Sequence, residues 1–189
     1  MKTLVFSRKA RVFFGLMTAL AIAGISPARA GVKPAENVPQ PVMADQVRHQ
    51  LVMLPYFNVF DNLQFEIRDD NTVVLSGQVT RPILKSDAAN VVRRVEGVSN
   101  VVNNIEVLPL SRFDDRIRLA LYRTLFSNPQ LDRYALQAVP PIHIIVKNGN
   151  VTLVGVVASQ ADKNVAGILA NGVPGTFKIT NDLRVENKS

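Results

Sequence analysis

The chain of 189 residues contains no cysteine and only two histidines. The absence of cysteine excludes disulfides, thiolate nucleophiles and cysteine-ligated zinc, and it leaves no residue to carry a lipid at the end of a signal sequence. Neither His49 nor His143 has a second histidine or a carboxylate at metal-ligand spacing. Phosphate-binding glycine loops and nucleophile-elbow motifs are also missing. We therefore expect no catalytic residue, no metal and no cofactor.

Positive charge is in excess only in the first 30 residues. The chain has a formal charge of +7, but five of its 22 basic residues and none of its 15 acidic residues fall in this segment. The rest of the chain carries 17 basic and 15 acidic residues, a net charge of +2. This balance is weak for a nucleic-acid-binding protein of this size, so no nucleic-acid partner is expected.

Residues 1–30 have the pattern of a signal peptide. Basic residues precede a largely apolar segment of 14 residues from Val12 to Ile25, and Ala28 and Ala30 are the small residues that signal peptidase reads. Fourteen helical residues span about 21 Å, less than the roughly 30 Å hydrocarbon core, which makes a membrane anchor the weaker interpretation. We expect cleavage after Ala30 and a periplasmic protein that is not a lipoprotein. A flexible, proline-containing linker should follow over residues 31–41.

The chain repeats itself. Asn71–Val79 (NTVVLSGQV) returns 78 residues later as Gly149–Val157 (GNVTLVGVV), and matches at the same offset continue for about 30 residues. A period of this length indicates two small domains rather than a solenoid. Each copy carries a glycine inside a strand pattern, Gly77 and Gly155. We expect both on the core face, where their small size lets a helix pack closely.

Hydrophobic periodicity predicts the same order of elements in both copies: helix, strand, strand, helix, strand. The modules should cover residues 42–108 and 112–187. The fold class is therefore α+β, with two tandem αββαβ modules, each a three-stranded mixed sheet packed against two helices. Asn103 and Asn181 occupy matching positions on the core face of the last strands.

The two hairpins should turn differently. Asn148–Gly149 is a strong two-residue turn signal and would pair Val146 with Val151. In the first module a two-residue turn would place Glu66 in the core, and an unpaired buried carboxylate is costly. A three-residue loop, Asp69–Asn71, avoids this, with its last residue in the left-handed conformation.

These motifs resemble those of the BON (bacterial OsmY and nodulation) domain. The resemblance rests on VVLSGQV (73–79) with VEGVSNVVNNIEV (95–107), and on VTLVGVV (151–157) with ITNDLRV (179–185). It covers nearly all of the chain after the signal. It implies a non-catalytic protein of the bacterial envelope, in envelope maintenance or osmotic stress, from a family often proposed to contact phospholipid surfaces.

The first helix of the second module is apolar on two faces. One face should lie in the core; the second stripe and its flanking arginines comprise Arg116, Leu119, Tyr122, Arg123 and Phe126. A second apolar face beside arginines suits an interfacial contact. The partner would be a phospholipid membrane, with anionic lipid favoured by the arginines, or an envelope protein in a lipid-independent scaffold. Packing of this stripe on the first module is the alternative.

The outer sheet face of the second module is also apolar. Ile145, Val154 and Val156 should share that face with His143, whereas the first module has mostly polar residues there. An apolar outer face in only one copy indicates that it is covered. The first module is the favoured cover.

Overall fold

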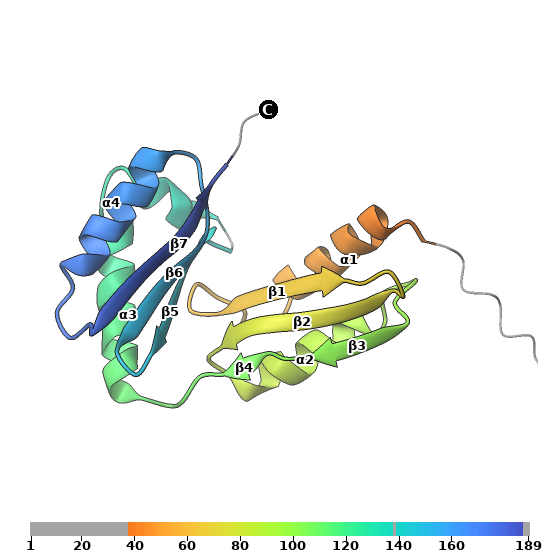
Figure 1. Ribbon diagram of the computed structural model, residues 1–189. Helices are drawn as coiled ribbons and strands as arrows, with labels where there is room; N and C mark the ends of the chain where they lie inside the picture. The colour runs from red at the N-terminus through yellow and green to blue at the C-terminus, as the bar shows by residue number, and fades with distance from the viewer. Residues whose placement is uncertain (1–37, 138, 187–189) are drawn as a thin grey trace, which may run out of the picture. The chain divides into compact units, whose positions relative to one another are not determined.

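The computed structural model describes residues 38–137 and 139–186. The predicted signal peptide and most of the predicted linker lie outside these residues. Figure 1 shows an α+β chain of two modules, as the sequence predicts. The elements of the first module are α1 (Gln40–Val52), β1 (Asn62–Ile67), β2 (Thr72–Val79), α2 (Pro82–Val92), β3 (Asn100–Asn103) and β4 (Glu106–Val107).

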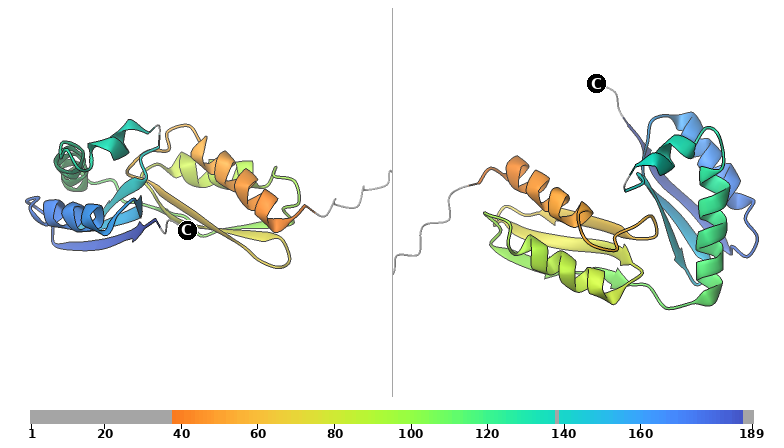
Figure 2. Two further views of the ribbon diagram at one scale, coloured as in Figure 1. Left: turned by 90° about the horizontal axis from the view of Figure 1, so that it is seen from above. Right: turned by 180° about the vertical axis from the view of Figure 1, so that it is seen from behind.

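The first module forms a mixed sheet in the order β1-β2-β3, with β4 also beside β2. β1 runs antiparallel to β2, whereas β3 and β4 run parallel to it, so the predicted last strand is interrupted between Asn103 and Glu106. Both helices cover one face of this sheet (Figure 2). α1 begins at Gln40, inside the expected linker, because Pro41 is well tolerated in the first turn of a helix.

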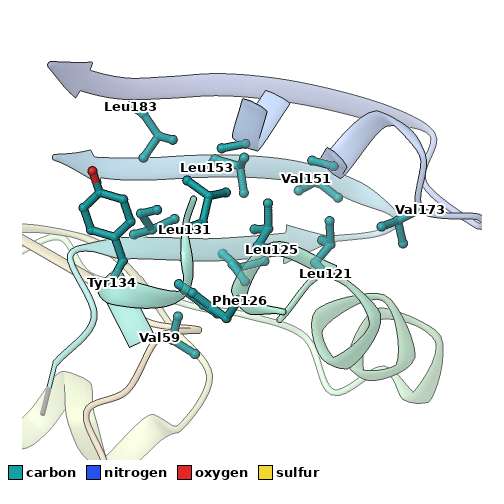
Figure 3. Packing of buried hydrophobic residues seen from close by; sticks show 14 of the residues in the cluster. Val59, Leu121, Leu125, Phe126, Leu131, Tyr134, Val151, Leu153, Val173 and Leu183 are labelled. Carbon is teal, nitrogen blue, oxygen red and sulfur yellow. The ribbon is translucent and has the colours of Figure 1, made fainter. Parts of the chain in front are cut away.

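The second module repeats this plan with one addition. Its elements are α3 (Arg112–Phe126), the 3-10 helix η1 (Asp132–Leu136), β5 (Ile142–Lys147), β6 (Asn150–Val157), α4 (Gln160–Asn171) and β7 (Lys178–Val185). β5 is antiparallel and β7 parallel to the central β6. The long connection that contains η1 has no helical counterpart in the first module. It contributes Leu131 and Tyr134 to the core (Figure 3).

Both hairpin predictions are confirmed. Val146 lies opposite Val151 across the Asn148–Gly149 turn. In the first module Phe65 lies opposite Leu75, which leaves the neighbouring Glu66 on the exposed side of the sheet. Asn71 has a φ of 58°, the expected left-handed conformation. The argument that Glu66 must stay out of the core therefore predicted the correct length of this loop.

The reason given for the strand glycines is wrong. Gly77 and Gly155 have φ angles of 105° and 129°, which side-chain-bearing residues rarely adopt. A Cβ atom on Gly77 would lie 2.0 Å from the Asn62 carbonyl oxygen, and one on Gly155 would lie 1.9 Å from that of Pro141. The obstacle is therefore the backbone at the start of the antiparallel partner strand. Helix packing over the glycine is not the cause.

The matching asparagines join helix to sheet in both modules. Asn103 donates its side-chain amide to the Lys85 carbonyl of α2 at 2.7 Å, and its side-chain oxygen accepts from the Ile105 amide. Asn181 makes the same pair of bonds, to Lys163 in α4 and to Leu183. The same pair of bonds therefore ties the second helix to the last part of the sheet in both modules.

Candidate functional site

α3 is fastened to the second module by buried charged groups. Ser111 caps the helix by accepting a hydrogen bond from the Asp114 amide. The carboxylate of Asp114, fully buried, accepts from the amides of Asn148 and Gly149 at 2.9 and 2.8 Å. Arg118 donates to the Val146 carbonyl at 2.6 Å. These bonds fix which face of α3 points away from the sheet.

The outward face of α3 is rich in arginine. Arg112, Arg116 and Arg123 are exposed there, and Leu119, with 49% of its surface accessible, lies among them. Spacings of three and four residues place these four side chains in one row along the helix. A half-exposed leucine between guanidinium groups can meet a surface that is anionic outside and apolar beneath.

The remaining two residues of the predicted stripe turn toward the protein. Phe126 is only 9% exposed and belongs to the core of the second module. Tyr122 is 37% exposed. Its ring centroid lies 5.0 Å from that of Phe126 and 6.2 Å from that of Phe60. Phe60 comes from the first module. The stripe is therefore divided: Arg116, Leu119 and Arg123 face solvent, Phe126 is buried, and Tyr122 lies at the boundary.

The first-module contact comes from residues 57–61, which we call the docking segment. The described residues all fall in one compact unit. The carbonyl of Val59 accepts a hydrogen bond from the Ile144 amide at 2.8 Å, and the Val59 side chain lies in the same cluster as Phe126 (Figure 3). Phe57 packs on the His143 ring at 5.7 Å. The alternative of packing on the first module thus applies to the inner part of the stripe.

The apolar outer face of the second sheet is partly covered. Ile145 is 6% exposed, whereas Val156 stays 39% exposed. Lys147 on the same face forms an ion pair with Glu106 of the first module. Ile145 is therefore covered and Lys147 beside it meets the first module, whereas Val156 is not covered.

Sequence reasoning missed an exposed aromatic pair at the N-terminal end of α3. The rings of Phe113 and Phe177 lie 6.2 Å apart, and the Arg116 guanidinium lies 5.8 Å from the centre of the Phe113 ring. Phe177 is 77% exposed. The repeat offset held a signal for it, because Phe177 stands where the first module has Ser99. The pair extends the apolar part of the outward α3 face.

A second buried polar cluster surrounds Asp162 at the start of α4. Its carboxylate accepts from Gln130, from Arg133 at 2.6 Å and from the Tyr134 hydroxyl at 2.8 Å. Burial, the largest influence, would raise the pKa of Asp162. The hydrogen bonds from Gln130 and Tyr134 and the charge of Arg133 outweigh it, so the pKa is lowered. All of these contacts tie the η1 connection to α4, which marks the cluster as structural.

The described residues contain neither a cluster of metal-binding side chains nor a membrane-spanning helix. Within residues 38–137 and 139–186, no group of three or more histidines and carboxylates is placed to hold a metal ion. In the same residues, no helix has both the length and the apolar character needed to cross a membrane. His49 is exposed on α1, and His143 lies on β5 against Phe57.

Comparison with known proteins gives a family and a distant likeness. The family model described as "BON domain" matches residues 42–109 and 114–187. No curated protein matches the chain. Among solved structures, two of CdsD, a structural protein of the type III secretion system of Chlamydia trachomatis, are similar. One is 14% identical over 77% of this chain and 94% of that chain, with a TM-score of 0.28. The other, of the C-terminal domain of CdsD, is 14% identical over 79% of this chain and 100% of that chain, with a TM-score of 0.29.

Proposed function

Because the chain belongs to the BON domain family, whose domain is non-catalytic, we propose that it is an envelope protein that associates with phospholipid membrane surfaces through α3. The contact is made by Arg116, Leu119 and Arg123, with Tyr122 at its edge. The observation that carries the proposal is the exposed Leu119 within a row of three arginines. The signal pattern in residues 1–30 supports export to the periplasm.

The size of this surface sets the expected affinity. Burial of apolar area contributes about 25 cal/mol per Å², so one leucine and the edge of one tyrosine supply only a few kcal/mol. Each arginine near an anionic surface adds about 1 kcal/mol. Association costs several kcal/mol in lost translational and rotational freedom. Binding should therefore be weak, reversible, selective for anionic lipid and reduced by salt.

Vesicle flotation with the full-length mature chain tests the proposal. Vesicles of phosphatidylcholine alone are compared with vesicles that also contain phosphatidylglycerol. The variant Arg116→Glu with Arg123→Glu should lose at least about tenfold in binding to the anionic vesicles, since both attractions become repulsions. Leu119→Asp should also weaken binding. The matched control is His49→Asp, at an exposed position of α1, and it should bind as the wild type does.

Two results would overturn the proposal. Equal flotation of wild type and the double arginine variant would show that α3 is not the membrane surface. Absence of binding to either vesicle, together with retained co-purification of one envelope protein, would favour the lipid-independent scaffold. The exposed Phe113 and Phe177 pair is the surface on which that scaffold would depend, so Phe177→Ser would then abolish co-purification.

A further inference from the structure

His143 lies where the docking segment meets the second module. It stands next to Ile144, whose amide bonds to Val59, and its ring packs on Phe57. Its Nδ1 atom is buried and has no hydrogen-bond partner among the described residues. A neutral imidazole tolerates this site at modest cost. An imidazolium adds a charge and a second N–H donor, and holding that charge in a site largely removed from water costs considerably more.

The docking segment covers apolar surface of α3 while its base stays on the first module. Phe60 contacts Tyr122, and Val59 packs in the cluster that contains Phe126. Asp61, fully buried, anchors the base by accepting hydrogen bonds from the Thr80 amide and hydroxyl of its own module. Withdrawal of Val59 and Phe60 would therefore break contacts with the second module, while the bonds between Asp61 and Thr80 in the first module remain.

We propose that the docking segment is a releasable cover over the inner part of the α3 stripe, and that protonation of His143 releases it. Release exposes Tyr122 and Phe126 beside the arginines. The consequence for membrane binding rests on the proposed function, whereas the release itself does not.

The charges around His143 give the direction of the effect. Desolvation is the largest influence and lowers the pKa of His143. The nearby backbone of Asp61 and Asn58 and the Asp61 carboxylate favour the charged form but offset this only in part. The carboxylate is already engaged with Thr80 and with the Asn58 amide. The other charged residues lining the groove that contains His143 are Arg48 of α1 and Asp182 and Arg184 of β7, all exposed.

A lowered pKa in the docked state means that docking is strongest where both states are neutral. Above the usual pKa of 6.5, the docked and released forms bind no proton at His143 and docking is at its full strength. As the pH falls below that value, the released form gains a proton that the docked form resists. The docked population should therefore decrease with acidification, in the range where histidine titrates.

A chain without cysteine allows this to be measured by site-specific labels. The variant Met53→Cys with Ile168→Cys places nitroxides at exposed sites, one directly after α1 and one on α4. Pulsed dipolar spectroscopy at about pH 7.5 should give one narrow distance distribution, and at about pH 5.5 a second, broader population. Adding His143→Phe should keep the distance distribution narrow at both pH values. Adding Val59→Asp, which puts a carboxylate in the apolar contact, should broaden it at both.

Controls separate release from unfolding and from the other histidine. His49→Gln should leave the pH response unchanged, and far-ultraviolet circular dichroism should be the same at both pH values. An unchanged wild-type distribution at low pH overturns the proposal, as does an equal response in His143→Phe. Loss of the circular dichroism signal at low pH overturns it too, because the change would then be global unfolding. None of these readouts involves lipid, so a failure of membrane binding is scored separately.

Discussion

In both modules a buried carboxylate joins the connection before the first strand to the start of the second helix, but the carboxylate comes from opposite sides of this joint. In the first, the connection before β1 supplies the acid: Asp61 accepts from the Thr80 amide at 2.6 Å, just before α2. In the second, α4 supplies the acid, and the connection before β5 supplies the donors, among them Tyr134 to Asp162. The joint between the central strand and the second helix needs a buried acceptor with donors around it. Either side can provide the acceptor.

The connection before the first strand of the sheet therefore has a different role in each module. In the second module, residues of η1 cover their own core, with Tyr134 also accepting from the Ala158 amide at 2.8 Å. In the first module, Asp61 is the acid at the joint. Phe57 packs against the core of its own module and on His143, whereas Val59 and Phe60 pack against the core of the second module. The first module thus makes the contact between modules, and the second retains the exposed α3 face.

The largest expected effect concerns the strand glycine that both modules share. Gly155→Val and Gly77→Val should each destabilise the protein by roughly 3 kcal/mol or more, because a β-branched residue must adopt a strongly positive φ and its Cβ meets a backbone carbonyl. Chemical denaturation measures the loss. Gly172→Ala is the control, since Gly172 has a φ of −80° and its Cβ would lie no closer than 3.4 Å to a neighbour. Similar stability of Gly155→Val and wild type would contradict the geometry.

The second-largest expected effect concerns Asp162, the buried acid that only the second module takes from its second helix. Asp162→Ala should cost about 2 kcal/mol, because it leaves the Tyr134 hydroxyl and the Gln130 amide without their acceptor. Since the pKa of Asp162 is lowered on folding, its contribution is present above the usual value of 3.8 and is lost as the pH falls below it. The variant should therefore show a flatter fall in stability between about pH 5 and pH 3 in thermal melts. A wild-type slope in that range would contradict this assignment.

Local patterns in the sequence were enough for the hairpins and their registers. Alternation of apolar residues, the Asn148–Gly149 turn and the position of Glu66 fix which residues pair, because each acts within a few residues of the turn. The repeat offset also identified Asn103 and Asn181 as matching core-face positions. Their bonds to the helices above them required the structure.

Contacts between distant segments could not be predicted from the sequence. Nothing local marks Val59 as reaching Ile144, about 85 residues further along the chain. The second stripe of α3 was identified from periodicity, yet periodicity cannot tell a face that meets solvent from one that meets Phe60. The same limit hid the backbone reason for Gly155, because φ depends on how β6 meets the start of β5.

The smallest expected effect concerns the ion pair between the modules. Lys147 and Glu106 remain 48% and 41% exposed, so water screens their attraction, and exposed pairs typically contribute less than about 1 kcal/mol. Lys147→Met should therefore leave the distance distribution between labels at positions 53 and 168 nearly unchanged at neutral pH, whereas Val59→Asp should broaden it. The physical reason is that Val59 fills a buried apolar site and Lys147 does not. If Lys147→Met released the modules as fully as Val59→Asp, charge pairing and not the docking segment would hold them together. High salt would then broaden the wild-type distribution as well, and under the docking-segment account it should not.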